Sequence, residues 1–182
     1  MELSKDLIKK VIKGDRNAQH TLYNTYSAKM YGVCLRYLAN PEIARDILHD
    51  GFIKVFSSIK TFRGNGSLEG WILRIMVNTA LEYIRRSKNN FKVDIDEAKT
   101  LEAINNTEGP DYQMLLKIIA ELPQQYRTVF NLYAIEEYTH AEIAEMLGIS
   151  ESTSKSNYSR AKAILRVRLE NFLDVNYEEF FR

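Results

Sequence analysis

The sequence predicts an all-α fold of two helical modules joined by a flexible linker. Apolar residues recur at helical spacing through most of the chain. Glycine and proline are scarce, with 8 and 3 among 182 residues. An acidic segment of poor apolar periodicity, 89–109, interrupts the helical pattern and is interpreted as the linker. The predicted modules are therefore 1–88 and 110–182, and the extended linker would span at most roughly 70 Å.

The overall composition indicates a soluble folded protein. Hydrophobic residues make up 45% and charged residues 27%. The net charge of +1 means that any nucleic-acid binding must come from local clusters of cations. Neither a membrane span nor a signal-peptide core is evident. One cysteine cannot form an internal disulfide, and the lack of a disulfide framework fits the cytosol, so we expect a cytoplasmic protein. Cys34 is predicted to be a buried core thiol; the alternative, a reactive thiol, has no supporting neighbours.

Four helices are predicted in the first module. A short helix follows Ser4, and a long one runs from about Asn17 to Leu38. A third helix starts at Pro41, after Asn40, and reaches about Lys60. A loop at 62–67 precedes the fourth helix, which is expected over about 68–87.

The fourth helix has an unusual outer face. At 100° per residue, Trp71, Arg74 and Asn78 share it with Glu82 and Arg85, opposite an apolar side. An aromatic ring beside hydrogen-bonding groups suits unpaired bases, and the preceding loop suits a flipped-out base. Arg85, Arg86 and Lys88 would add phosphate contacts. The alternative is that Trp71 covers the core while the cations are merely solvated.

The third helix has an acidic outer face with one exposed aliphatic residue. The face comprises Glu42, Asp46, His49, Asp50, Ile53 and Ser57. Its charge repels DNA and suits a protein partner. The spacing of Asp46, His49 and Asp50 also fits metal ligands on one helix, but no second cluster completes such a site.

The second module is predicted to contain a helix-turn-helix. Helices are expected from Pro110 to near Leu122 and from Pro123 to about Ile135. Thr139 and Glu142 then form a capping box. Gly148 permits a tight turn, and Ser150 caps the last helix. A short helix, a glycine turn and a capped second helix indicate duplex DNA binding.

The last helix divides into a buried stripe and a polar face. The stripe is Ser154, Tyr158, Ala161, Leu165, Leu169 and Phe172, whereas Ser152, Ser156, Ser159 and Arg160 lie opposite with Lys155 at the flank. Small hydroxyls and cations are what contact with bases and phosphates requires. The alternative is a solvated helix face. His20 and His140 are interpreted as structural.

The chain resembles the extracytoplasmic-function (ECF) sigma factors of bacterial RNA polymerase. Residues 44–52, Phe62-Arg63-Gly64 and the segment from Trp71 to Arg86 resemble sigma region 2, and residues 122–169 resemble sigma region 4. The resemblance covers most of the chain. It implies a non-enzymatic initiation factor, without a cofactor or a metal, that binds core polymerase and promoter DNA. An anti-sigma factor is a further candidate partner, and no membrane insertion is implied.

The resemblance also implies residue roles. Reading of the −35 element is expected from Ser152, Thr153, Lys155, Ser156, Ser159 and Arg160. Reading and melting of the −10 element is expected from Phe62, Arg63, Asn65, Ser67, Trp71, Arg74, Asn78, Thr79, Arg85 and Arg86. The polymerase β′ clamp helices are expected to contact Asp46, His49, Asp50 and Ile53, while region 4 would sit on the β flap.

The chain departs from the family pattern at several positions. Ser154 stands where an apolar residue is usual, and we expect its hydroxyl to bond internally, for instance to the carbonyl four residues earlier. Asn157 stands where a cation is common. Arg45 replaces a commonly acidic residue and His49 a common glutamine, which changes the clamp contact.

Three functions of other classes compete with this reading. The first is a homodimeric helix-turn-helix regulator that acts without core polymerase and prefers a palindromic site. The second is a metal-dependent nucleic-acid enzyme built on Asp46, His49 and Asp50. The third is an adaptor that binds proteins through the Ile53 face and no DNA.

Overall fold

The computed structural model describes residues 5–90 and 110–180, with side chains described for 6–87 and 114–170. Every regular element in these ranges is helical, which confirms the predicted all-α fold. The contacts divide the chain into two units, one ending at Val93 and the other beginning at Asp94. The last helix of the first unit continues to Asn90, and the rest of the predicted linker lies outside the described residues.

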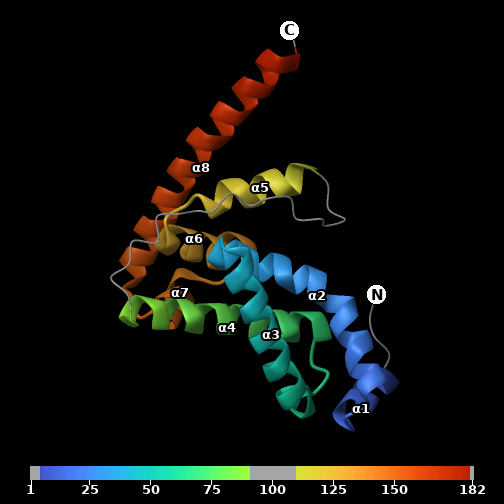
Figure 1. The fold of residues 1–182 in the computed structure, drawn as a ribbon. Helices are drawn as coiled ribbons and strands as arrows, with labels where there is room; N and C mark the ends of the chain where they lie inside the picture. The colour runs from blue at the N-terminus through green and yellow to red at the C-terminus, as the bar shows by residue number, and fades with distance from the viewer. Residues whose placement is uncertain (1–4, 91–109, 181–182) are drawn as a thin grey trace. The chain divides into compact units, whose positions relative to one another are not determined.

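The first unit is built on three helices that contact one another: α2 (Arg16–Leu38), α3 (Pro41–Ser58) and α4 (Leu68–Asn90) (Figure 1). The short α1 (Lys5–Ile12) packs on α2, and a 3-10 turn, Ile59–Thr61, follows α3. The largest fully buried side chains of the unit are Leu22, Met30, Leu35, Tyr37, Ile59, Ile72, Met76 and Leu81.

Local capping explains the sharp corner between α2 and α3. Ala39 ends α2 in the left-handed region, at φ 51°. The Asn40 side chain then accepts hydrogen bonds from the amides of Glu42 and Ile43, at 3.0 and 3.1 Å. Pro41 occupies the first helical position, where no amide is needed. The predicted start of α3 is therefore confirmed.

Two small residues shape the core of this unit. A Cβ added to Gly51 would lie 2.2 Å from Met76 Sδ, so the glycine permits the close crossing of α3 and α4. Cys34 is fully buried, and desolvation raises the pKa of its thiol to about 12. The prediction of a buried core thiol is confirmed.

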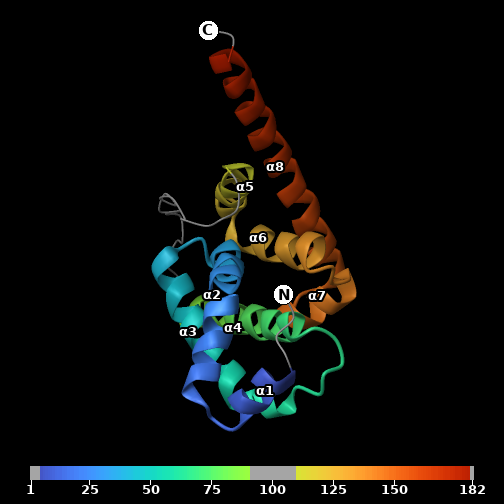
Figure 2. The same ribbon diagram turned by 90° about the vertical axis from the view of Figure 1, so that its right-hand side faces the viewer.

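The second unit contains α5 (Pro110–Ala120), α6 (Gln124–Phe130), α7 (His140–Leu147) and α8 (Glu151–Phe180). A π-helical turn, Asn131–Ile135, continues α6 where the sequence predicted an ordinary helix end. Figure 2 shows α8 as one helix that extends past the other helices of its unit.

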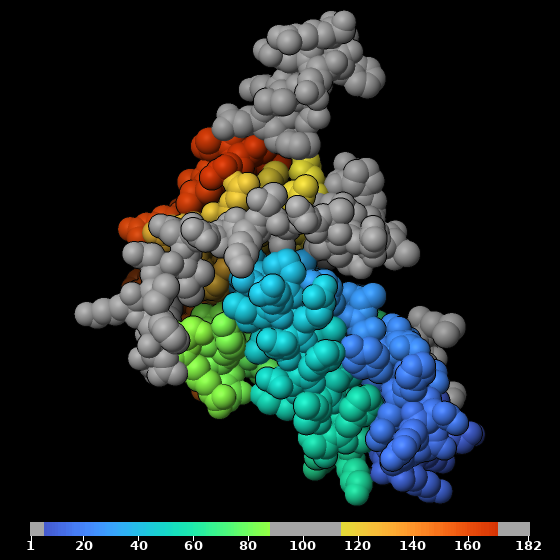
Figure 3. Space-filling view, in the orientation of Figure 1, coloured from blue at the N-terminus to red at the C-terminus, as the bar shows by residue number. Residues whose placement is uncertain are grey.

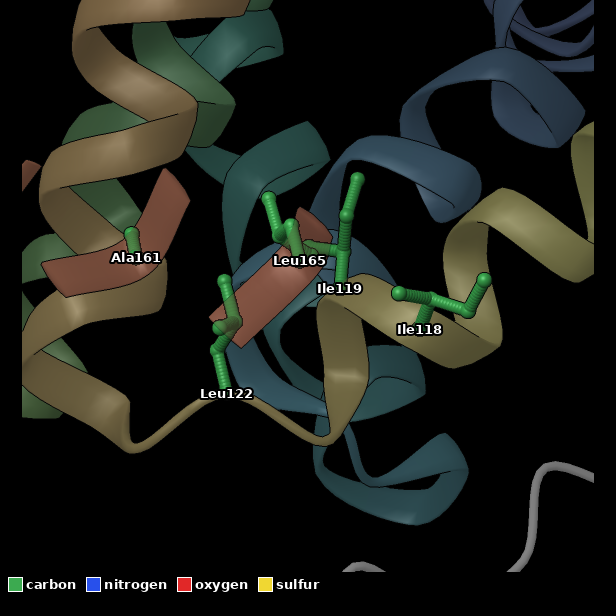
Figure 4. Packing of buried hydrophobic residues seen from close by; sticks show 5 residues of the cluster. All are labelled: Ile118, Ile119, Leu122, Ala161 and Leu165. Carbon is green, nitrogen blue, oxygen red and sulfur yellow. The ribbon is translucent and has the colours of Figure 1, made fainter. Parts of the chain in front are cut away.

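The core of the second unit lies where α5 and α8 meet. Figure 4 shows Ile118 and Ile119 from α5, Leu122 from the following turn, and Ala161 and Leu165 from α8. The predicted inward positions of Ala161 and Leu165 on α8 are confirmed. In the described ranges, no helix is both long and apolar enough to cross a membrane.

Candidate nucleic-acid interface

The start of α7 and the turn between α7 and α8 both have the predicted geometry. The Thr139 hydroxyl accepts from the Glu142 amide at 3.3 Å, and the Glu142 carboxylate accepts from the Thr139 amide at 2.8 Å. The Thr139 amide and the Thr139 hydroxyl both donate to the Glu142 carboxylate, and these two hydrogen bonds lower the pKa of Glu142. Gly148 adopts φ 64°, and the Ser150 hydroxyl accepts from the Thr153 amide at 3.0 Å. Because each bond is local, the turn fixes the direction in which α8 leaves α7.

The predicted DNA-reading residues of α8 form one exposed surface, called here the α8 face. Its members are Ser152, Thr153, Lys155, Ser156, Ser159 and Arg160, and all are exposed. Lys155 Nζ lies 2.6 Å from Glu151 Oε1, and this contact lowers the pKa of Glu151. Arg160 donates a hydrogen bond to the Tyr126 hydroxyl at 3.3 Å. Each of the two cations therefore has a contact within the protein when no ligand is bound.

Ser154 is fully buried, as predicted, but its hydroxyl has a different partner from the one expected. The hydroxyl lies 2.9 Å from His140 Nδ1 on α7, whereas we expected the carbonyl of Ser150. The His140 ring stacks on Tyr133 with the centroids 4.2 Å apart. Ser154 and His140 thus form a polar contact between the two helices of the helix-turn-helix, and the structural interpretation of His140 holds.

Asn157 is also buried, with 5% of its surface exposed. The sequence interpretation treated this position as one where a cation would contact phosphate. In the structure it faces the interior, so the substitution does not remove a charge from the α8 face.

Acidification is expected to destabilise the second unit through His140. Desolvation, aided by the charge of Lys155, lowers the pKa of His140 below the ordinary 6.5. As the pH falls past 6.5, His140 therefore binds a proton more readily in the unfolded chain than in the folded one. The stability of the folded unit that is present above that pH is lost below it. The carboxylates Glu142 and Glu151 titrate in a lower range because their pKa values are also lowered.

Thermal unfolding followed by circular dichroism at pH 7.5 and 5.5 measures this effect. The wild type should lose thermal stability on acidification, and His140→Gln should lose distinctly less. An equal loss in both proteins would contradict the role assigned to His140.

The outward residues of α4 form a second surface, called here the α4 face: Trp71, Arg74, Asn78, Arg85 and Arg86. Trp71 is half-buried, and the other four are exposed. Thr79, which was predicted to join them, is 4% exposed, and its hydroxyl donates to the carbonyl of Ile75 at 2.8 Å. Thr79 therefore supports α4 from within instead of facing outward.

The loop before α4 joins this face. The rings of Phe62 and Trp71 lie 5.6 Å apart and tilted by 52°. Arg63, Asn65 and Ser67 are exposed, as predicted. The Ser67 hydroxyl also accepts from the Gly70 amide at 3.0 Å, so it caps the first turn of α4, a role that the sequence interpretation missed.

Glu82 moderates the charge of the α4 face. Its carboxylate lies 2.8 Å from Lys54 Nζ on α3 and 2.5 Å from an Arg86 guanidinium nitrogen. Hydrogen bonding and attraction from Lys54, with the charge of Arg86, lower the pKa of Glu82. Part of the positive charge of Arg86 is thus compensated within the protein.

The predicted partner-binding residues of α3 form a third surface, called here the α3 face: Asp46, His49, Asp50 and Ile53. All four are exposed, and Ile53 exposes 66% of its surface. Figure 3 shows the α3 segment, in teal, lying open on the surface of the first unit. Among the residues with described positions, no group of three or more His, Cys, Asp or Glu side chains is placed to hold a metal ion, and Asp46, His49 and Asp50 form no such group.

The comparisons with known proteins agree with both units. Residues 22–90 match the family described as sigma-70 region 2, and residues 112–165 match sigma-70 region 4. The ECF RNA polymerase sigma factor SigW of Bacillus subtilis is 32% identical over 181 residues, covering 92% of this chain and 97% of SigW. The ECF RNA polymerase sigma-E factor of Haemophilus influenzae is 27% identical over 178 residues, covering 90% and 94%.

One solved structure supports the fold. The sigma factor RpoE of Bartonella quintana, crystallised with the anti-sigma factor NepR, aligns with a TM-score of 0.54 and 17% identity. The alignment covers 83% of this chain and 96% of that one. At this level of identity the likeness concerns the arrangement of helices.

Proposed function

The chain belongs to the ECF sigma factors of RNA polymerase, which are transcription initiation factors, and we propose that it directs core polymerase to promoters by reading two DNA elements. The main support is that one chain carries two outward cationic faces of different chemistry. The α8 face offers small hydroxyls and cations, which suit a duplex groove. The α4 face offers aromatic rings beside Arg and Asn, which suit unpaired bases.

We assign the −35 element to the α8 face and the −10 element to the α4 face with its loop. The modules that carry them are residues 110–182 and 1–88, and 89–109 tethers them. Phe62, Arg63, Asn65 and Ser67 would contact the melted strand together with the α4 face, while Thr79 holds α4 in shape. Arg85 and Arg86 would neutralise phosphates.

We assign contact with the β′ clamp helices to the α3 face. Its carboxylates would repel DNA, and the exposed Ile53 offers the apolar centre that protein interfaces require. The second unit would rest on the β flap. We further propose that an anti-sigma protein restrains the chain. We also propose that the chain acts in the cytoplasm, because promoters and polymerase are there.

Replacing Ile53 with lysine is expected to weaken binding to core polymerase by about tenfold or more. Burying such a side chain in an interface contributes about 1.5–3 kcal/mol, which corresponds to at least one order of magnitude in affinity. Because Ile53 is already exposed in the free protein, the fold should tolerate the change. Retention of core polymerase by the tagged protein measures the effect, with Ile53→Leu as the conservative control. Equal retention by both variants would remove the α3 face from the interface.

Reconstituted transcription tests the proposed function as a whole. Core polymerase from the source bacterium, mixed with fragments of its genome, should start RNA chains at a defined set of sites only when this protein is present. Sequencing of RNA 5′ ends identifies those sites and their upstream elements. Initiation no more specific than that of core alone would overturn the proposal, and a palindromic site bound without polymerase would favour the homodimeric regulator.

A further inference from the structure

Arg160 on the α8 face is held by a residue of another helix. Tyr126 lies on α6, 34 positions earlier, and its hydroxyl accepts a hydrogen bond from Arg160 Nη1 at 3.3 Å. The guanidinium carbon also lies 5.9 Å from the centre of the Tyr126 ring. An exposed arginine on a DNA-reading surface thus has one preferred direction in the free protein.

Tyr126 is itself firmly placed. Its half-buried ring packs against the cluster of Ile118, Ile119, Leu122, Ala161 and Leu165. The Tyr126 hydroxyl therefore lies where α6 packs against α8, and the core of the unit supports the ring that carries it. A phenol ring has only two rotatable side-chain bonds, so such packing fixes its oxygen well.

The hydrogen bond leaves Arg160 able to read a base. A guanidinium has five N–H groups and no acceptor, so four remain after one is donated to Tyr126. Two of these suffice for the paired contact with O6 and N7 of a guanine in the major groove. Holding a long side chain before binding also removes much of the entropy lost when it is immobilised on DNA.

We infer that Tyr126 is a positioning residue that aims Arg160 at one base pair and thereby sets the sequence preference there. The inference rests on the proposed function of the α8 face. It assigns a DNA-specificity role to a residue of α6, outside the helix that contacts the bases.

Selection from randomised duplexes tests the inference. The probe is a library of DNA duplexes in which a randomised segment lies upstream of a segment of fixed sequence. The protein is the full chain bound to core polymerase. Four proteins are compared: wild type, Tyr126→Phe, Arg160→Ala and the double variant. Tyr133→Phe is the matched control, since it removes an exposed phenol hydroxyl of the same unit whose ring packs on His140 and not on Arg160.

We expect Tyr126→Phe to bind the wild-type selected duplex about 3- to 10-fold more weakly. It should also lose base preference at the single position that Arg160→Ala loses, and the double variant should match Arg160→Ala. Tyr133→Phe should keep both affinity and preference. An unchanged preference in Tyr126→Phe, or a uniform weakening at all sequences, would overturn the inference while leaving the proposed function intact. If the wild-type complex selects no sequence beyond core alone, the proposed function fails and the inference fails with it.

Discussion

Replacing Arg127 with leucine is expected to lower the free energy of unfolding of the second unit by about 3 kcal/mol. Arg127 is 4% exposed, and its Nη1 donates to the carbonyls of Ala120 and Leu122 at 2.6 and 3.2 Å. Its Nη2 donates to Gln124 Oε1 at 2.5 Å. The last carbonyls of a helix lack partners in their own helix, so this side chain completes the end of α5. Leucine would leave buried carbonyls unsatisfied, at about 1–3 kcal/mol each.

Arg127 keeps its charge at neutral pH even though burial lowers its pKa to about 10. Urea unfolding of the full chain, followed by circular dichroism, measures the loss of stability. The matched control is Arg168→Leu, because Arg168 pairs with Glu121 at 2.5 Å on the surface with side-chain exposures of 50% and 42%. Exposed pairs contribute about 0–1 kcal/mol. Equal stability of the two variants would show that the buried hydrogen bonds of Arg127 contribute no more than a surface contact.

The elements that the sequence predicted well are those with local chemical signals. Asn40 before Pro41, the box of Thr139 with Glu142, and Ser150 after Gly148 each place a helix start through bonds within three residues. Such bonds depend on neighbours in the sequence, so spacing alone identifies them. The three exposed faces were predictable for a similar reason, since helical periodicity assigns each residue an angle.

The features that escaped prediction depend on helices meeting from a distance. The angle of a residue on its own helix does not reveal how far neighbouring helices cover it. The burial of Thr79 and Asn157 was therefore not predicted. Ser154 was placed correctly, but only the packing of α7 on α8 brings His140 to its hydroxyl. The contact of Tyr126 with Arg160 likewise joins two helices far apart in the sequence.

The two DNA-binding faces should fail separately when they are altered. Lys155→Ala together with Arg160→Ala is expected to weaken duplex binding by about 10- to 100-fold, since a paired arginine–base contact contributes about 1–3 kcal/mol. Losing the lysine alone should also reduce the slope of the logarithm of affinity against the logarithm of salt concentration by about one. Lys155 is paired with Glu151 in the free protein, so its share should be smaller than that of Arg160.

Trp71→Ala and Asn78→Ala are expected to spare duplex binding and to reduce open complexes. Stacking of a base on an aromatic ring contributes about 1–3 kcal/mol, so loss of Trp71 should lower strand opening by about tenfold or more. Asn78 is exposed, and its replacement should leave the packing of α4 intact. Trp71 also contacts Phe62, so Asn78→Ala is the cleaner probe of DNA contact on this face.

Permanganate footprinting, which detects unpaired thymines, and gel-shift titration of the same promoter fragment separate the two steps. The variants are assembled with core polymerase, and Lys117→Ala and Lys9→Ala serve as controls because both cations are exposed and lie outside the α8, α4 and α3 faces. If the variants of either face acted only by destabilising the whole protein, that set would reduce binding and opening in parallel. A division of labour instead requires that α8 variants bind weakly yet open the DNA they hold, whereas α4 variants bind and stall before opening.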